Sequence, residues 1–580
     1  MRRHHILIPL AALLAVSPLL VGGCSCGHDV AFHLQSWFDA ASQLQHGTLF
    51  PRWAMTPAWN AGEPRFIFYP PLSWMSGAVL SLIFPASALP VLYTFLVLMA
   101  AGFAMYRLAR EFVAPNAALI AAAIYLANPY MLFTAFERAA YAELLGAVWL
   151  PLLFLAVLRA RPTIHGVSIP LALLWLTNAP AAVMGSYTLA LLALFRVVQA
   201  MRLRIVATAT RGHDNSAAPA RLVLTYFFGT LLGLALPAFY LVPAAYERRY
   251  VQIAMAVIPN MRIQDNFLFV HTADAEHNGV LYTASMLAVC LLALTMFVTI
   301  LSMSTRSGQR ARPALPTLLL ALTFVIALLL TPLSLPLWLH LPEMAFLQFP
   351  WRLLAVLATV LGLALALLCN KLRNSPRVRM MSLIGAPLAA LALSLFCIHL
   401  YRQTCETSDM ASAIAEAFHT GHGVLPTDEY TPNDADNDII RPNDPAYWLT
   451  DDPQAFAPAT TANPGTADPN FDGTFPADQT LSTPAPHELH IRTAKTTYLV
   501  LNLRDYPNWE ISENGPSNMA IIPRKIHRND GLLALYLDKA SDYRVHIQWK
   551  TTRDQWIGYI LTVLALVALF GSLHFTRQTR

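Results

Sequence analysis

The stretch NAALIAAAIYLANPYMLFTAFERAAYAELLGAVWLPLLFLAVLR, residues 116–159, consists of two apolar runs separated by the polar segment FERAAYAE. Each run is roughly 17 to 19 residues long, close to the length that an α-helix needs to cross the hydrocarbon core of a membrane. Two such runs in succession form a helical hairpin, and FERAAYAE then lies at one membrane surface. The stretch therefore predicts a polytopic helical membrane protein.

The composition of the whole chain agrees with this interpretation. Of the 580 residues, 56% are hydrophobic and only 13% are charged, and the mean hydropathy is +0.46, whereas a soluble protein carries about 25% charged residues. The net charge of +5 comes mainly from short basic loops next to apolar runs. Because such loops mark the cytoplasmic side of membrane proteins, we expect no nucleic-acid binding.

The six cysteines show no spacing typical of a metal site, such as CxxC or a Cys/His pattern. Cys24, Cys26 and Cys405 are expected just outside the membrane, where an oxidising compartment permits a disulfide. The other three cysteines lie in apolar blocks and are expected to be inert packing residues.

Further apolar runs, oriented by the positions of Lys and Arg, predict about 12 crossings with both termini in the cytoplasm. A signal peptide is an alternative for the N-terminal run, although an uncleaved first helix accounts for the same residues. The segment YPPLSWMSGAVLSLIF, residues 69–84, is short and rich in proline at its start, so we expect an interfacial or re-entrant helix. The expected spans lie at about residues 6–21, 88–107, 116–134, 143–159, two within 166–197, 222–243, 279–302, 314–333, one ending at 370, 381–400 and 556–574.

The region from residue 402 onward differs in composition from the rest of the chain. Residues 430–485 are rich in Pro, Asp, Asn, Thr and Ala and have too few apolar residues to pack well. Runs such as TTYLVLNL and GLLALYLD then alternate in hydropathy with a period of two, which predicts a small antiparallel β-domain. The expected domains are a transmembrane domain at 1–401 with outside loops 22–87, 135–142, 244–278 and 334–348, an extracytoplasmic linker at 402–485, an extracytoplasmic β-domain at 486–553, and a final transmembrane helix with a short cytoplasmic tail at 554–580.

The first outside loop begins with GHDVAFHLQSW, in which His28, Asp29 and His33 follow directly after the first span. If residues 28–45 form a helix, Asp29 and His33 lie on the same face. A carboxylate flanked by imidazoles can act as a general base or bind a divalent cation. The alternative is a solvated polar loop, but the interleaved apolar residues and the cost of ionisable groups near a bilayer favour a functional role.

The same loop contains Arg52, Glu63 and Arg65 beside aromatic residues, in FPRW and GEPRFIFYPPLSW. Arginine binds phosphate through planar, bidentate contacts, which suits the phosphate of a lipid-linked donor. Anchoring of the loop in the membrane interface by aromatic side chains is an equal alternative. These aromatic side chains are Trp53, Trp59, Tyr69 and Trp74.

Two further motifs place charges at the outer ends of spans. FERAAYAE contains Glu137, Arg138 and Glu143, and FLQFPWRLL contains Arg352. Glu137 and Arg138 are expected to reach different partners, or to form an ordinary helix-end salt bridge with another loop. An arginine at the depth of Arg352 is expected to snorkel or to meet an anion. The sequence has no Walker A, βαβ-type GxGxxG or GxSxG motif, so it gives no support for soluble nucleotide chemistry.

These motifs are similar to those of known membrane proteins. GHDVAFHLQSWFDAASQLQHGTLFPRW followed by FIFYPPLSW resembles the GT-C superfamily of integral membrane glycosyltransferases, which carry an acidic motif in the first outside loop. GHDVAFHL…PRW…FYPPL, NPY…ERAAYAE…PLLFLA and LQFPWRLL resemble bacterial membrane proteins named 6-pyruvoyl-tetrahydropterin synthase-related. The tail DYPNWEISENG…DGLLALYL…VHIQW resembles the outside β-domain of YfhO-like proteins.

The resemblance implies a GT-C-like, all-α polytopic bundle that transfers a sugar from a polyprenyl-phosphate donor to a glycan, lipid or protein acceptor. Transfer would take place at the outer face of the bacterial cytoplasmic membrane. Asp29 stands at the position of the catalytic or metal-binding carboxylate, with Mg²⁺ or Mn²⁺ as the expected cation. The expected catalytic residues are Asp29, His28, His33, Glu137 and Glu143, and the expected ligands of the donor phosphate are Arg52, Arg65, Arg138 and Arg352.

Two other functions remain as alternatives. A transporter or flippase for a lipid-linked or polar molecule requires ionisable residues near the middle of the spans. In this sequence they gather at the outer rim, which favours an enzyme. A non-catalytic envelope assembly protein would use the β-domain as its working part.

Overall fold

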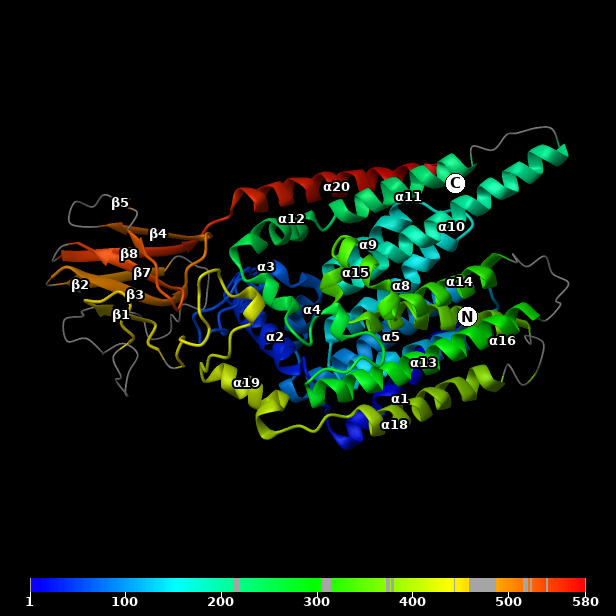
Figure 1. Cartoon of the computed structure of the whole chain (residues 1–580), viewed down its shortest axis with the longest axis horizontal. Coiled ribbons are helices and arrows are strands. Elements are labelled where there is room, and N and C mark those ends of the chain that lie inside the picture. The colour runs from blue at the N-terminus through cyan, green and yellow to red at the C-terminus, as the bar shows by residue number, and fades with distance from the viewer. Residues whose placement is uncertain are drawn as a thin grey trace.

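The computed structural model describes residues 2–211, 218–304, 314–371, 376, 380–442, 444–457, 487–493, 495–514, 520–521, 524–538 and 541–578. A bundle of helices occupies most of the length of the molecule, and a β-domain lies at one end (Figure 1). α1 begins and α20 ends at the end of the bundle that points away from the β-domain (Figure 1). The helices are α1 (Arg2–Gly22), α2 (Val30–Gln45), α3 (Arg65–Phe68), α4 (Pro71–Ser81), α5 (Leu89–Arg110), α6 (Pro115–Leu126), α7 (Pro129–Phe136), α8 (Tyr141–Leu158), α9 (Ile164–Thr177), α10 (Ala179–Arg211), α11 (Ala218–Ala235), α12 (Ala238–Glu247), α13 (Ala275–Ser304), α14 (Ala314–Leu329), α15 (Leu335–His340), α16 (Leu354–Lys371), α18 (Ala386–Tyr401), α19 (Ala411–His419) and α20 (Arg553–Gln578).

Within the described residues, eight helices are long and apolar enough to cross a membrane. Two more pairs, Pro219–Ala235 with Ala238–Tyr250 and Leu315–Leu329 with Pro332–His340, pass the same test but are bent by 69° and 89°. The chain is therefore a multi-pass membrane protein. Each of the 12 expected spans coincides with an apolar helix or with one of these bent pairs, but the apolar segments Ile6–Gly22 of α1 and Ile164–Thr177 are shorter than the eight candidate spans. The number of crossings and their sides of the membrane stay predictions.

Two of the basic loops that oriented the spans lie mostly outside the described residues, at 305–313 and at 372–375 and 377–379. Proline-rich residues 69–84 form α4, which has 11 residues and is not among the candidate spans. α4 packs against α2, α5 and α9. This arrangement agrees with the expectation that the segment does not cross the membrane as a separate span.

The hairpin predicted from residues 116–159 is present. α6 and α7 together form the span Pro115–Phe136, and α8 returns from Tyr141 to Leu158. The first span is interrupted at Asn128, whose side chain accepts a hydrogen bond of 2.9 Å from the backbone N of Tyr130. Pro129 is the first residue of α7, a position where its missing N–H and fixed φ are favourable. FERAAYAE therefore forms the tight connection between α7 and α8.

The predicted antiparallel β-domain is also present. It consists of two four-stranded antiparallel sheets with strand orders β1-β3-β7-β6 and β2-β8-β4-β5. Alternate residues point into the core between the sheets, where Leu499 and Leu535 pack with Val545 and Ile547. The strands are β1 (Tyr447–Thr450), β2 (His487–Thr493), β3 (Thr497–Arg504), β4 (Trp509–Asn514), β5 (Ala520–Ile521), β6 (Lys525–Ile526), β7 (Leu532–Leu537) and β8 (Ser541–Trp549).

The structure differs from the predicted linker over residues 402–457. This region contains α19, the short 3-10 helix η10 (Asp428–Tyr430) and strand β1. Ile440 and Trp448 of this region are buried because they pack with Val500 of β3. The rest of the predicted linker, residues 458–486, lies outside the described residues.

Trp53 in the first outside loop joins this loop to the β-domain. Its ring is fully buried and lies 5.6 Å from the rings of Tyr506 and Trp509 and 5.8 Å from that of Trp549. The interpretation of Trp53 as a membrane-interface anchor is therefore wrong, because the ring packs within protein. The contact fixes the β-domain against the loop that begins with Asp29.

A disulfide joins Cys26 to Cys405, whose Cα atoms are 5.0 Å apart, while Cys24 is free. The bond ties the start of the first outside loop to the chain that follows α18. Hydrogen bonds support the same junction, since Cys26 N donates to Gln403 O at 3.4 Å and Gln403 N donates to Ser25 Oγ at 2.8 Å. The loop that carries Asp29 is thus held from both sides.

Replacing both Cys26 and Cys405 with Ser is expected to lower the free energy of unfolding by about 2–5 kcal/mol. The reason is that the crosslink joins residues 379 positions apart and so restricts the unfolded chain. Thermal unfolding of the purified double variant, compared with Cys24→Ser as a control, measures the effect. Equal melting temperatures for both proteins and the wild type would show that the hydrogen bonds alone hold the junction.

Candidate active site

A cavity of about 530 Å³ lies among the helix ends that face the β-domain. It is bounded by the start of α2, the junction of α3 and α4, the α7–α8 connection, α12, residues 343–352 and η10. Apolar and aromatic side chains form much of its wall, and charged groups are gathered in a few places. Its ionisable lining residues other than tyrosine are Asp29, His33, Arg138, Glu143, Arg248, Glu343, Arg352 and Glu429.

Asp29 stands immediately before α2 and points its carboxylate toward the cavity. Its backbone N donates a hydrogen bond of 2.9 Å to Arg138 O. The two chain segments approach so closely that a Cβ atom at Gly27 would overlap the Glu137 carbonyl, which explains why a glycine stands here. The Asp29 side chain is 43% exposed, and its carboxylate lies 3.8 Å from the Arg138 guanidinium. Asp29 is therefore a solvent-accessible carboxylate in a fixed place.

Glu143 organises the buried charges next to Asp29. Its Oε2 accepts a hydrogen bond of 2.6 Å from Arg138 Nη1 and lies 3.2 Å from Arg352 Nε. Its Oε1 accepts a hydrogen bond of 2.5 Å from the Tyr130 hydroxyl. Both oxygens of Glu143 are thus engaged, and this one carboxylate positions two guanidinium groups that lie more than 200 residues apart in sequence.

Arg138 and Arg352 form a buried pair of cations at the cavity wall. The ring of Phe349 lies 5.7 Å from the guanidinium of Arg138 and 4.9 Å from that of Arg352. Burial lowers the pKa of Arg138, but the carboxylates of Glu143 and Asp29 outweigh it and raise the pKa overall. Arg352 Nη1 donates a hydrogen bond of 2.7 Å to Leu347 O, whereas its buried Nε forms no hydrogen bond within the described part of the chain. The two guanidinium groups are balanced in charge by the carboxylates of Glu143 and Asp29, so an anion would bind here through direct hydrogen bonds from the guanidinium N–H groups.

His33 also lines the cavity, but aromatic rings enclose it. It is 2% exposed. Burial lowers the pKa of His33 to about 4, and the nearby Asp29 carboxylate opposes this shift only in part. The imidazole is therefore neutral at neutral pH and serves mainly as a packing group beside Asp29. The rings whose centroids lie 5.3 to 6.2 Å from it are those of Phe32, Trp37, Tyr69 and Tyr141.

The stability of the protein is expected to depend on His33 between about pH 6.5 and pH 4. The folded pKa of about 4 lies below the roughly 6.5 of an exposed histidine. The unfolded chain therefore binds the proton first, and stability falls as the pH falls through this range, by about 3 kcal/mol in total. His33→Gln is expected to flatten this part of a plot of melting temperature against pH, whereas the exposed His46→Gln is expected to keep the wild-type slope. An unchanged plot for His33→Gln would assign the pH dependence to other groups.

His28 and Glu137, both predicted as catalytic, do not line the cavity. His28 is exposed. Glu137 lies beside Gln403 and His28; burial raises the pKa of Glu137, and the hydrogen bond from Gln403 opposes the shift. The α7–α8 connection turns sharply, with Ala139 at φ 49°, so Glu137 and Arg138 point to different sides. The structure therefore places Arg138 and Glu143 at the cavity and His28 and Glu137 away from it.

Arg52, predicted as a phosphate ligand, also lies away from the cavity. Its Nη2 donates to Phe239 O at 3.2 Å and to the Tyr559 hydroxyl at 3.0 Å. Its guanidinium lies 4.5 Å from the centre of the Phe50 ring. Arg52 therefore joins the first outside loop to α12 and α20.

Arg65, the other predicted phosphate ligand in this loop, is buried and surrounded by protein partners. Its Nε lies 2.8 Å from Glu63 Oε1, and its Nη1 and Nη2 donate to Ser36 Oγ and Thr427 Oγ1, each at 3.0 Å. Its guanidinium also lies 4.4 Å from the centre of the Phe32 ring, which lines the cavity. Arg65 supports the cavity wall from behind and does not face the cavity.

The resemblance predicts a divalent cation at Asp29. Among the described residues, no three His, Cys, Asp or Glu side chains are grouped so that they could hold a metal ion. Glu143 has both oxygens engaged by Tyr130 and the two arginines, and Asp29 has a guanidinium beside it. The protein groups at this wall do not fit a divalent cation, so we assign no step to one, and the cation stays a prediction from the resemblance.

The cavity contains charged residues that the sequence patterns do not single out. Arg248 and Glu343 form an ion pair of 3.2 Å with both side chains nearly half exposed. Glu429 and Tyr430 enter from η10. Arg248 stands in the segment YERRY at the end of a helix, where a solvated cluster is the simplest interpretation, and Glu429 stands in a polar stretch without periodicity. A local pattern carries no signal for either position, because both depend on packing between distant segments.

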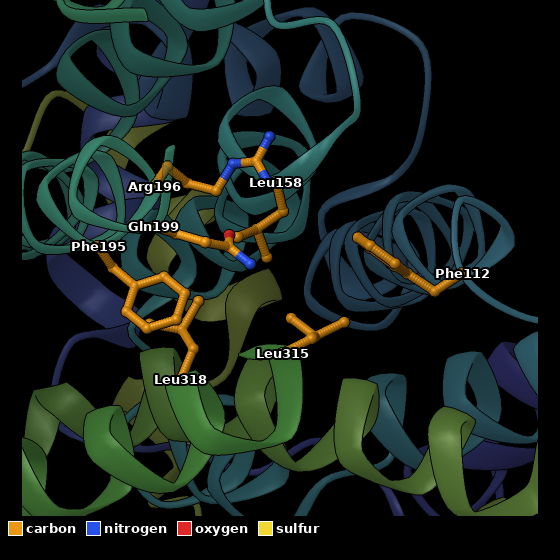
Figure 2. A pocket seen from close by; sticks show the side chains of 7 residues that line it. All are labelled: Phe112, Leu158, Phe195, Arg196, Gln199, Leu315 and Leu318. Carbon is orange, nitrogen blue, oxygen red and sulfur yellow. The ribbon is translucent and has the colours of Figure 1, made fainter. Parts of the chain in front are cut away.

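A second, much smaller pocket lies near the C-terminal ends of α5 and α8, beside α10 and the start of α14. Figure 2 shows the side chains around it, which are apolar except for Arg196 and Gln199. Its volume of about 20 Å³ is enough for a single water molecule. The large cavity is therefore the better candidate for a substrate site.

Comparisons with known proteins give little further information. No protein-family model matches the chain, and no curated protein matches it. Among solved structures, arabinofuranosyltransferase AftD from Mycobacteria is 11% identical with a TM-score of 0.41, and arabinosyltransferase EmbB from Mycobacterium smegmatis is 13% identical with a TM-score of 0.32. Each likeness covers 96% of this chain but only 60% and 63% of those chains. Because both TM-scores are below 0.5, we infer neither fold nor activity from them.

Proposed function

We propose that the chain is a membrane glycosyltransferase that transfers a sugar from a polyprenyl-phosphate donor to an acceptor hydroxyl at the outer membrane face. The resemblance of its motifs to the GT-C superfamily suggests this reaction. The observation that carries the proposal is the cavity wall, where an accessible carboxylate, Asp29, lies 3.8 Å from Arg138. Arg138 in turn is paired with Arg352 by Glu143.

In the proposed reaction Asp29 is the general base. The acceptor oxygen attacks the anomeric carbon of the donor and forms the new C–O bond. The bond from that carbon to the phosphate oxygen breaks, and polyprenyl phosphate leaves with the electron pair. The proton of the acceptor hydroxyl passes to the Asp29 carboxylate, which is accessible enough to receive it.

Arg138 and Arg352 would bind the phosphate of the donor. The donor is a phosphodiester with one negative charge, and the leaving polyprenyl phosphate carries up to two. Guanidinium groups that are already in place therefore stabilise the transition state more than the bound donor, which is what catalysis requires. Glu143 already orients both guanidinium groups, and they are buried beside Phe349. The two arginine side chains therefore do not have to move during the reaction.

The remaining wall of the cavity suits the lipid part of such a donor. Trp175, Leu241 and Phe346 line it, and Phe346 is 39% exposed at the surface of the helical bundle. Pockets that bind extended apolar ligands are lined mainly by such side chains, with a few polar groups that fix orientation. The proposal therefore assigns the polyprenyl chain to this apolar side and the phosphate to the arginine pair.

The experiment that tests the proposal uses the full-length protein in lipid nanodiscs. It is incubated with a panel of polyprenyl-phosphate sugars, with and without Mg²⁺ or Mn²⁺, and mass spectrometry follows release of polyprenyl phosphate. Conversion of at least one donor is the expected result. Movement of an intact donor across a proteoliposome membrane without conversion would contradict the proposal and favour a flippase.

A further inference from the structure

Four carboxyl groups line the large cavity, and one of them differs from the rest. Asp29, Glu143 and Glu343 each lie within 4 Å of an arginine, at 3.8, 2.6 and 3.2 Å. Glu429 has no side chain as a hydrogen-bond or ion-pair partner within the described part of the chain. Its side chain is partly buried in the cavity wall, and this burial raises the pKa of its carboxyl group.

The segment that carries Glu429 is held firmly in place. Thr427 N donates a hydrogen bond of 2.8 Å to Glu63 Oε2, and Thr427 Oγ1 accepts one of 3.0 Å from Arg65. Glu63 and Arg65 are themselves a buried ion pair. η10 follows directly, so the backbone at Glu429 is anchored on the buried pair behind the wall.

Aromatic rings stand next to Glu429 at the cavity. The ring of Tyr430 stacks on that of Phe68, with centroids 5.8 Å apart and an angle of 8° between the planes. Phe68 O accepts a hydrogen bond of 2.7 Å from the Tyr240 hydroxyl, and all three aromatic residues line the cavity. The wall around Glu429 is therefore a rigid apolar surface with one unpaired carboxyl group.

An unpaired, partly buried carboxyl group costs free energy unless water or a ligand supplies its hydrogen bonds. Adjacent hydroxyl groups of a sugar can donate hydrogen bonds to the two carboxyl oxygens of Glu429. The flat aromatic rings beside it can pack against the C–H faces of the same sugar. A metal ion fits less well, because no three His, Cys, Asp or Glu side chains among the described residues are grouped so that they could hold one. The chemistry at this wall matches a neutral molecule rich in hydroxyl groups.

We propose that Glu429, together with Tyr430 and Phe68, binds the glycan acceptor and presents its hydroxyl group to Asp29. The part concerning the reaction rests on the proposed glycosyltransferase function. The part concerning binding does not, since a hydroxyl-rich ligand would be held at this wall whatever follows. The acceptor class is thereby narrowed from glycan, lipid or protein to a glycan.

The test compares wild type, Glu429→Leu and Asp438→Leu, each full-length and in nanodiscs. Asp438 is a matched control, because it is an exposed carboxylate nine positions further along the same segment and does not line the cavity. Binding of fluorescent protein to an array of short neutral oligosaccharides is measured first. Glu429→Leu is expected to weaken binding about 10-fold or more, and Asp438→Leu to leave it unchanged.

Thermal unfolding separates a binding role from a structural one. Because the carboxyl group of Glu429 has no side-chain partner, its replacement by Leu is expected to leave the melting temperature unchanged or to raise it. Equal glycan binding by wild type and Glu429→Leu, or no binding by wild type, would overturn the inference. A loss of binding with a lower melting temperature would also overturn it, because the residue would then be structural.

Rates of donor hydrolysis and of sugar transfer show whether the acceptor role of Glu429 or the proposed glycosyltransferase function has failed. If both the proposed function and this inference hold, the Glu429→Leu variant hydrolyses the donor, with water as the acceptor of the sugar, at the wild-type rate. It transfers the sugar to an oligosaccharide at least 10-fold more slowly than the wild type. Equal loss of both reactions would overturn the acceptor role of Glu429. If the wild type consumes no donor yet binds oligosaccharides through Glu429, the proposed function fails and the glycan-binding wall stands.

Discussion

Asp29→Asn is expected to release polyprenyl phosphate about 10²- to 10⁴-fold more slowly than the wild type, the usual contribution of a positioned general base. The amide has nearly the size of the carboxylate but does not take up a proton at neutral pH. The loop is expected to keep its place, because Asp29 is held through its backbone N, which donates to Arg138 O at 2.9 Å. The effect is measured under single-turnover conditions with a donor that the wild type converts. Mass spectrometry monitors the polyprenyl phosphate that is released.

The matched control for this variant is His46→Asn. His46 stands at the other end of α2 and is exposed, and its ring Nδ1 lies 2.8 Å from the carbonyl oxygen of Ser42 on the same helix. It is expected to react at the wild-type rate. If Asp29→Asn also reacts at that rate, Asp29 is not the base, and another group must accept the proton.

Glu143→Gln is expected to have the largest effect on stability. The substitution removes the single negative charge between Arg138 and Arg352, while Tyr130 keeps an acceptor. Arg352 then lacks a counter-charge and Arg138 keeps only the partly exposed Asp29 at 3.8 Å, which costs about 3–5 kcal/mol. A lower melting temperature, together with weaker binding of polyprenyl phosphate because the two arginines are no longer oriented, is the expected result.

Glu137→Gln serves as the comparison for Glu143→Gln. Glu137 is also a buried carboxyl group on the same α7–α8 connection, but its neighbours are Gln403 and His28 instead of two arginines. Its substitution is expected to change the melting temperature far less. Equal destabilisation by the two variants would show that Glu143 has no special part in holding the arginine pair.

The membrane bundle could be predicted from sequence because apolar length is a local property. Every expected span coincides with an apolar helix or a bent helix pair, including the hairpin on either side of FERAAYAE. The sequence also indicated that Arg138, Glu143 and Arg352 need partners, since each is a charged residue at the end of a span. It could not show that they pair with one another, because α8 and the start of α16 are about 200 residues apart in the chain.

The candidate site was harder to predict where long-range packing decides the orientation of a side chain. Arg65 and Arg138 both stand in aromatic, polar segments outside the spans, yet Arg65 is enclosed by Glu63, Ser36 and Thr427. Whether an arginine faces a cavity or lies behind its wall depends on contacts with segments hundreds of residues further along the chain, such as that of Thr427 with Arg65. The same holds for Glu429, which stands in a region predicted to be an unstructured linker.

The first outside loop shows how a local rule can be overruled. An aromatic residue next to apolar spans favours the membrane interface, but Trp53 lies in the core of the β-domain. Asp39, on the helix α2 that begins directly after Asp29, is buried and accepts hydrogen bonds from the backbone N of Met55 and Thr56 at 2.7 and 3.0 Å. These contacts fold the loop back toward α2, and no periodicity in the sequence encodes them.

The measurement that bears most directly on the proposed site is the position of bound polyprenyl phosphate, determined by cryo-electron microscopy of the wild-type protein in nanodiscs. The proposal predicts phosphate oxygens within hydrogen-bonding distance of the Arg138 and Arg352 guanidinium groups, next to Asp29, with the lipid chain along the apolar side of the cavity. A phosphate bound at another place, or an empty cavity in the presence of saturating ligand, would contradict it.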